Sequence, residues 1–232
     1  MPHALRALVG ALTNYAYYTA RPRWINPLHY ARLWHTRRAW QALRADHGDV
    51  LAIVAAMTPS GSTGCNPTDY LMLYRWIRYK KPQWVLECGS GMSTGVIAHA
   101  LRQNGSGHVV SMEESEDYAR KVRELLPADL TPFATILHSP VVVHAYGDHQ
   151  GVSYADVPDH PYEMVFIDGP VARRPGIGKC FNADVIRVAA NGRPVVAFLD
   201  QRITTLRALR AVLPQARIRY SAASKLSTIS IE

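Results

Sequence analysis

A glycine-rich turn between an apolar segment and a helix-forming segment is the most informative stretch of the sequence. The apolar residues Trp84–Leu86 lead into Glu87-Cys88-Gly89-Ser90-Gly91, and apolar residues then recur at the helical positions 96, 97, 100 and 101. A strand, a tight turn and a helix in this order open the βαβ units that bind nucleotides. Gly89 and Gly91 have no Cβ, so their backbone can take positive φ and come close to a ligand. We therefore expect an α/β fold organised around this turn.

The turn departs from the dinucleotide-binding pattern in two ways. Its third glycine comes one position late, and Glu87 precedes the first glycine by two. A carboxylate at the end of a strand would repel a pyrophosphate, whereas it suits a cation such as an amino group. Ser93 and Thr94 stand where the helix begins and its N–H groups are free. We expect a ligand with a positive charge here; the alternative is an ordinary turn that binds nothing.

A second acid ends the next predicted strand, His108–Glu113. Adenosine-type cofactors have their ribose hydroxyls bound about 20 residues beyond the glycine turn, which is where this acid lies. A carboxylate can accept hydrogen bonds from both hydroxyls. Glu114 competes with Glu113, and we favour Glu113 because the strand length places it at the carboxyl edge of the sheet. Alternatively, both acids are solvated and open the helix that follows.

A third acid ends the apolar segment 163–168, which continues into Gly169-Pro170. An uninterrupted apolar run is typical of a parallel strand buried on both faces. Asp168 would then point into the cleft where ligands of open α/β sheets bind, and it is the best candidate for a catalytic base. Arg173, Arg174 and Lys179 follow in a loop suited to an anionic or hydroxylated substrate. The alternative is a solvated basic loop.

The remaining pattern predicts elements on both sides of this segment. Helices are expected over 3–18, 27–46, 50–57, 67–79, 92–103, 116–126, 181–190 and 203–213, and strands over 133–143, 195–200, 217–221 and 226–231. Residues 144–162 are expected to form a polar loop with unligated histidines. The last two strands are joined by too few residues for a parallel crossover, so they must be antiparallel neighbours.

The charge is concentrated near the N-terminus. The chain has a net charge of +8, and residues 1–48 contain seven arginines and one aspartate, which makes +6. The predicted helix 27–46 mixes aromatic residues with arginines. We expect its aromatic side chains to pack inward and its arginines to be solvated; a membrane surface, a nucleic-acid surface and an acidic-substrate surface are the alternatives.

The apolar stretches and the cysteines of the sequence bear on membrane topology and on the cellular compartment. No stretch reaches the ~20 apolar residues of a membrane span, and the N-terminal residues lack the basic start and cleavage site of a signal peptide. Cys65, Cys88 and Cys180 are isolated in the sequence. Such cysteines fit a reducing environment, so we expect a cytoplasmic protein.

From residue 66 to the end, the chain resembles the class I S-adenosylmethionine (SAM) methyltransferases. The shared features are the acid-x-Gly-x-Gly motif at 87–91, Glu113, Ile167-Asp168-Gly169-Pro170 and the terminal hairpin. The residues of these motifs are similar to those of small bacterial members related to the plant polysaccharide O-methyltransferases. The resemblance implies a Rossmann-like, mostly parallel seven-stranded sheet with a C-terminal antiparallel hairpin. It further implies a SAM-binding domain at 66–232. Residues 1–65 precede it as a basic, aromatic-rich helical extension, in which residues 60–65 are either a lid over the cofactor or a plain linker.

The resemblance also implies roles for individual residues. SAM would be the cofactor, with the methionine part at the turn, the ribose at Glu113, the adenine near Ser139 and the reacting methyl beside Asp168. The implied cofactor-binding set is Glu87, Gly89, Ser90, Gly91, Ser93, Thr94, Glu113, Ser139 and Asp168.

The expected reaction is O-methylation of a small-molecule or sugar hydroxyl. A divalent cation on Asp168, Asp200 and Gln201 is possible but not favoured, because no third carboxylate is evident. Three further classes of protein are compatible with the sequence: an RNA methyltransferase or RNA-binding protein that uses the basic N-terminal region, an NAD(P)-binding oxidoreductase, and a non-catalytic SAM-binding scaffold. We favour a small-molecule or glycan acceptor over nucleic acid. Peripheral membrane contact by the N-terminal helices is also compatible with the sequence.

Overall fold

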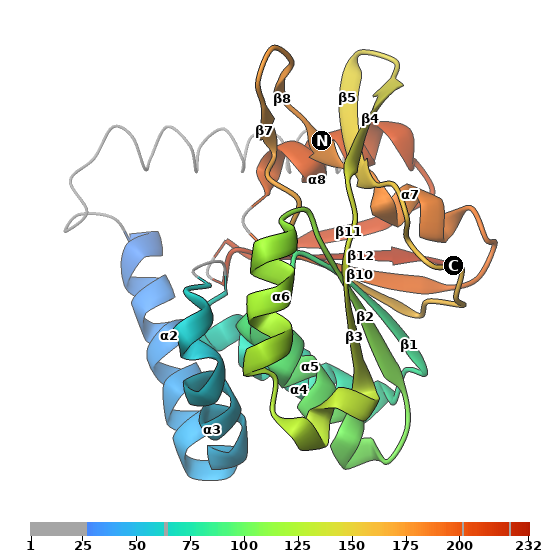
Figure 1. Cartoon of the computed structure of the whole chain (residues 1–232). Coiled ribbons are helices and arrows are strands. Elements are labelled where there is room, and N and C mark those ends of the chain that lie inside the picture. Colours follow the sequence, from blue (N-terminus) through green and yellow to red (C-terminus); the bar gives the residue numbers. More distant parts are fainter. Residues whose placement is uncertain (1–26, 63–64, 201, 223) are drawn as a thin grey trace.

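A seven-stranded sheet forms the centre of the molecule in the computed structural model, which describes residues 27–62, 65–200, 202–222 and 224–232. The strand order is β11-β12-β10-β6-β1-β2-β3 (Figure 1). All neighbouring pairs are parallel except those of β12, which runs antiparallel to β10 and β11. The strands are β1 (Trp84–Cys88), β2 (His108–Glu113), β3 (Ala134–His138), β6 (Met164–Ile167), β10 (Val195–Asp200), β11 (Arg217–Tyr220) and β12 (Leu226–Ile231). The predicted sheet and its terminal hairpin are confirmed.

Helices cover both faces of this sheet. One face carries α4 (Pro67–Lys80), α5 (Met92–Asn104), α6 (Glu116–Leu125) and the short η3 (Ala128–Phe133); the other carries α7 (Asp184–Ala189) and α8 (Ile203–Val212). Successive strand residues point to opposite faces, so Val85 joins the first hydrophobic core and Leu86 the second. Helix α4 is capped by Asn66, as expected. Asn66 and Asp69 form a capping box, and Pro67 is the first helical residue.

The N-terminal region packs on the first of these faces. Helix α2 (Pro27–Asp46), α3 (Gly48–Met57) and the short η2 (Thr58–Ser60) precede α4. Leu43, Val50 and Met57 are fully buried in the first core. Residues 27–62 are thus packed against the sheet domain, and the helix predicted over 3–18 lies outside the described residues. No helix within the described ranges is long and apolar enough to cross a membrane.

The aromatic side chains of α2 do not pack inward as expected. Tyr30, Trp34 and Trp40 are exposed, and the buried positions of the helix are Ala39 and Leu43. The physical reason is that small and aliphatic residues fit the close contact with the neighbouring helices, which leaves the larger rings on the outer face.

A second, smaller sheet corrects three predictions. The strand expected over 133–143 is two strands, β3 and β4 (Val141–Tyr146), because Pro140 cannot donate a ladder hydrogen bond and interrupts the pairing. The expected loop 144–162 contains β5 (His149–Tyr154), which pairs with β4 across a two-residue turn at Gly147 and Asp148. The helix expected from 181 begins at Asp184, because β9 (Phe181–Asn182) pairs with β5 instead. A ribbon of β7 (Arg173–Arg174) and β8 (Gly178–Lys179) stands nearby (Figure 1).

Candidate functional site

A cavity of 450 Å³ opens at the carboxyl edge of the central sheet. Strand β1 lies between β2 and β6, where the strand order reverses, and open α/β sheets bind ligands at such a point. Segments distant in the sequence meet here: the cavity is lined by Gly61, Ser62, Gly89, Ser90, Glu113, Glu114, Tyr118, Tyr154, Asp168, Gly169, Pro170, Val171 and Arg202.

The glycine turn forms the floor of this cavity. Gly89 has φ 97° and donates its N–H to the carbonyl of Met112 at 2.9 Å. A Cβ on Gly89 would lie 2.7 Å from the backbone nitrogen of Gly169, so no other residue fits without movement of the backbone. Gly91 faces the loop that follows η2, because its own Cβ would lie 2.6 Å from the hydroxyl of Ser62. The predicted lid segment therefore reaches the turn through Ser62, and its residues 63 and 64 lie outside the described residues.

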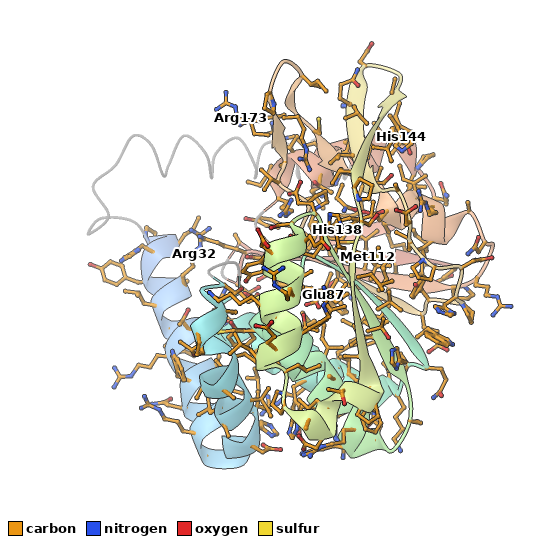
Figure 2. All side chains as sticks on the ribbon, in the orientation of Figure 1. Arg32, Glu87, Met112, His138, His144 and Arg173 are labelled. Atoms are coloured by element: carbon orange, nitrogen blue, oxygen red, sulfur yellow. The ribbon has the colours of Figure 1, made fainter. Side chains whose placement is uncertain are left out.

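Glu87 lies buried beneath the turn, near the centre of the molecule (Figure 2). Its Oε2 accepts hydrogen bonds from the hydroxyls of Thr94 at 2.5 Å and Ser111 at 2.6 Å. Its Oε1 has no hydrogen-bond partner among the residues that the structure describes. Burial raises the pKa of Glu87 to about 7. The hydroxyls of Ser111, Ser93 and Thr94 oppose this shift, because they stabilise the ionised form. A fully buried carboxylate with one unsatisfied oxygen is a built acceptor for a cationic group.

Glu113 reaches the cavity from the end of β2. Its Oε2 accepts hydrogen bonds from the backbone N–H of Ser90 at 3.2 Å and from the Ser90 hydroxyl at 3.1 Å. Its Oε1 accepts from the backbone N–H groups of Glu114 and Ser115. These contacts hold the carboxylate at the rim of the glycine turn. Ser139, at the end of β3, donates its N–H to the Glu113 carbonyl at 2.9 Å.

Ser139 differs from the other residues of the predicted set. Its hydroxyl is fully buried, accepts a hydrogen bond from the N–H of Asp156 and donates one to the carbonyl of Pro140. The hydroxyl therefore joins the residues just before β4 to those just after β5, where the second sheet begins. A contact between Ser139 and a ligand stays a prediction.

Asp168 follows β6 and lines the cavity opposite Glu113. The side chain is half-buried, and burial raises the pKa of its carboxyl, while the nearby Arg202 guanidinium opposes this shift. The thiol of Cys65 lies 3.8 Å from its Oδ2. Arg202 donates hydrogen bonds to the backbone carbonyls of Asp168 and Pro170, so it fixes the loop that presents the acid.

The basic residues after Asp168 do not gather around the cavity. Glu114 forms an ion pair with Arg174 at 2.7 Å and accepts a hydrogen bond from the N–H of Val171 at 2.8 Å. This tie holds the β7–β8 ribbon to the end of β2 and commits the Glu114 carboxylate to the protein. Arg173 and Lys179 are exposed, and Arg173 points away from the body of the molecule (Figure 2). Of these three basic residues, Arg174 alone lies near the rim.

Three site residues escaped the sequence analysis. Ser111 pairs with Glu87 across the β1–β2 ladder, and a serine facing an acid in adjacent strands would have been a signal. Arg202 had no signal, because its contacts at the site are with backbone carbonyls. Tyr154 fell in the expected loop. It is fully buried, lines the cavity and has a hydroxyl without a hydrogen-bond partner in the described part of the chain, next to Gly169.

Within the described residues, no group of three or more His, Cys, Asp or Glu side chains could hold a metal ion. Of the set considered for a divalent cation, Asp168 lies at the cavity, Asp200 is buried at the end of β10, and Gln201 lies outside the described residues.

Comparison with known proteins agrees with this geometry. Residues 86–197 match the family model of a methyltransferase domain. No curated protein sequence matches the chain. The fold is similar to an O-methyltransferase from Bacillus cereus in complex with SAH, with a TM-score of 0.56 and 17% identity over 84% of this chain and 97% of that one.

Two further structures share the fold. A candidate caffeoyl-CoA O-methyltransferase from Staphylococcus aureus has a TM-score of 0.56 and 12% identity, over 85% of this chain and 98% of that one. A methyltransferase from Geobacter sulfurreducens has a TM-score of 0.51 and 12% identity, over 78% and 87%. The match over residues 86–197 and the fold together support a class I SAM-dependent methyltransferase.

Proposed function

We propose that the cavity holds SAM and that the chain transfers its methyl group to a hydroxyl of a small molecule or sugar. The observation that carries this proposal is Glu87, whose buried Oε1 lacks a partner among the described residues, beneath a turn that only glycine can form. An ammonium group, such as that of the methionine part of SAM, would supply the missing donors. Two of the similar structures carry the name O-methyltransferase, which supports oxygen as the acceptor atom.

The residues of the chain then divide the work of binding and proton transfer. Glu87 would hold the ammonium group and Glu113 the ribose hydroxyls, while the glycine turn allows close backbone approach. SAM supplies a methyl group on a sulfonium that is already a good leaving group. The protein therefore mainly needs to align the acceptor and to accept its hydroxyl proton. Asp168 would take this role, and its raised pKa supports proton uptake.

The cofactor assignment is tested by isothermal titration calorimetry with SAM and, separately, NAD. We expect saturable SAM binding and no NAD binding. Glu113→Ala should weaken SAM binding at least ~10-fold, about 1.4 kcal/mol, whereas the exposed Glu124→Ala on α6 should leave it unchanged. Binding of NAD in place of SAM would revive the oxidoreductase hypothesis. Unchanged affinity in Glu113→Ala would remove the ribose assignment alone.

The catalytic assignment is tested with Asp168→Asn. A panel of phenols, catechols and sugars is first screened for formation of SAH by the wild type. With an acceptor in hand, Asp168→Asn should lower kcat by about 10²–10⁴-fold, because the isosteric amide cannot accept the proton. The Kd for SAM should stay nearly the same. An undiminished kcat would show that another group removes the proton.

A further inference from the structure

The outer face of α2 is a feature that methyl transfer leaves unused. Tyr30, Leu33, Trp34 and Trp40 are 54%, 54%, 52% and 38% exposed, respectively. Together with Arg37, Arg38 and Arg44 they recur at spacings of three and four residues, so they share one side of the helix. Exposed rings of this size are normally buried in a protein or placed at an interface.

The arginines lie among the rings rather than opposite them. The Arg38 guanidinium lies 4.6 Å from the centroid of the Trp34 ring, and that of Arg44 lies 5.4 Å from the Trp40 ring. The sequence of α2 contains no acid before Asp46. The exposed face is therefore both apolar and positively charged, which is the combination that an anionic membrane surface binds.

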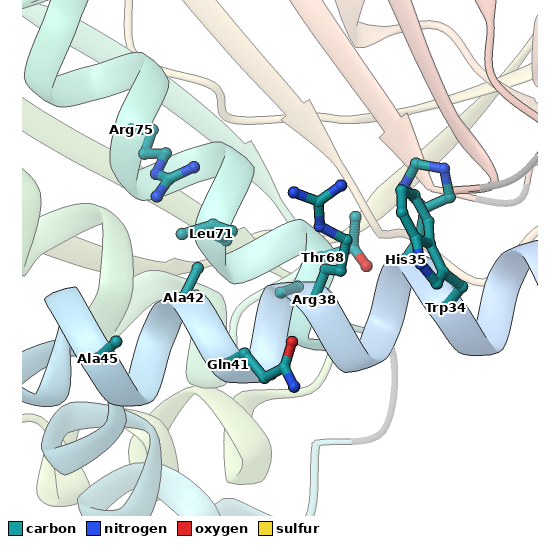
Figure 3. A pocket seen from close by; sticks show the side chains of 10 residues that line it. Trp34, His35, Arg38, Gln41, Ala42, Ala45, Thr68, Leu71 and Arg75 are labelled. Atoms are coloured by element: carbon teal, nitrogen blue, oxygen red, sulfur yellow. The ribbon is translucent and has the colours of Figure 1, made fainter.

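A groove of 600 Å³ runs beside this face, between α2 and α4 (Figure 3). Arg38 and His35 line it from α2, and Arg75 and Thr68 line it from α4. Figure 3 shows Arg38 and Arg75 on facing helices, on either side of Leu71. Guanidinium groups are well suited to bind the oxygens of a phosphate group.

The positive charge of this face distinguishes between the partners that could cover it. A second copy of the chain would bring the same arginine-rich helix against it. Residues 1–26 carry Arg6, Arg21 and Arg23 and no acid, so their charge is also of the same sign. An anionic partner is complementary, and the exposed leucine and tryptophans favour the water–lipid boundary over a nucleic acid. We propose that α2 docks this methyltransferase on the surface of anionic membranes.

The test is cosedimentation of the full chain with vesicles of phosphatidylcholine alone or with about 30% phosphatidylserine. We expect binding to the anionic vesicles only, with a blue shift of tryptophan fluorescence. R37E/R38E should weaken binding at least ~30-fold, because each arginine near the surface contributes roughly a factor of five. W34A/W40A should weaken it ~10-fold or more.

The matched control is R187E/R193E. These exposed arginines lie at α7 and just after it, on the other side of the sheet, and their reversal changes the net charge by the same amount. The control should bind as the wild type does. Thermal unfolding followed by circular dichroism confirms that each variant is folded.

The proposal would be overturned by equal loss of binding in the control and in R37E/R38E, by equal binding to neutral vesicles, or by a dimer that W34A/W40A dissociates. Binding of an RNA homopolymer with no binding of vesicles would likewise overturn it and assign the face to nucleic acid.

Discussion

At the scale of single residues, Glu87 shows how the site is prepared before a ligand arrives. The carboxyl group lies on β1, an inner strand of the sheet, facing Ser111 of β2 across the ladder. Burial favours its neutral form and raises its pKa to about 7. Two hydroxyls satisfy one oxygen and leave the other for an incoming donor. We therefore expect Glu87 to lose a proton when a cationic ligand binds.

The sign of the pH dependence follows from this shift. A carboxyl whose pKa is higher in the folded state stabilises the free protein fully below its unfolded pKa, about 4.5, and this contribution is lost as the pH rises through about 7. Binding of an ammonium group requires the ionised form. SAM affinity should therefore fall up to ~10-fold per unit as the pH drops below about 7.

Calorimetry in buffers of different ionisation enthalpy checks this expectation. SAM binding at about pH 6 should release close to one proton, and binding at about pH 8 should release almost none from this group. Glu87→Gln, which keeps the shape of the side chain, should abolish the release and flatten the stability profile of the free protein between about pH 4.5 and 7. Proton release that persists in Glu87→Gln would point to another group.

At the scale of elements, the turn after β1 and the turn after β6 are packed backbone against backbone. Gly89 and Gly105 both have positive φ, 97° and 72°, but of the two Gly89 alone has neighbours among the described residues in the space of a Cβ. Gly105→Ala should cost about 1 kcal/mol of the free energy of unfolding, from backbone strain alone. Gly89→Ala should cost ~3 kcal/mol or more, because the Gly169 backbone must also move.

Urea unfolding followed by circular dichroism measures both costs. Because the two positions share the same kind of strain, their difference isolates the contact between the turns. Equal costs would mean that the turn after β6 yields easily, and would remove the packing argument for Gly89.

The elements that the sequence predicted well are those with one dominant physical signal. The central strands are rich in Val, Leu and other apolar residues, and α4 has a capping box, so their limits could be predicted to within a few residues. The β4–β5 hairpin escaped because its polar residues, such as His144, resemble a loop when taken singly. Its signal was the Gly147-Asp148 turn, which follows the β-branched residues 141–143. Tyr154 was missed together with the hairpin that positions it.

Long-range contacts set the rest of the site. The backbone contacts of Arg202 and the tie from Glu114 to Val171 and Arg174 join parts of the chain that no local pattern relates. The outward aromatic rings of α2 were mispredicted because burial depends on which side of a helix meets its neighbours. A helix that mixes aromatics and arginines leaves that choice to packing.

At the scale of the whole molecule, charge and chemistry are separated. The cavity lies at the carboxyl edge of the sheet and is lined by Glu113, Glu114 and Asp168, whereas most arginines of α2 are exposed on the helical layer. Helix α3 and η2 connect the two, since they lead from α2 to Ser62 at the glycine turn. Helix α2, which we propose binds a surface, and the predicted lid therefore belong to one continuous segment of the chain.

The strand order also determines when the site can first exist. Strand β1 pairs on one edge with β2, the next strand along the chain, but on the other edge with β6, which begins only at Met164. During synthesis on the ribosome, that second edge stays open until most of the chain has emerged. The cavity further requires Arg202. We therefore expect ligand binding to become possible only late in synthesis. A nascent chain stalled before β6 would expose an unpaired edge of β1 instead of a binding site.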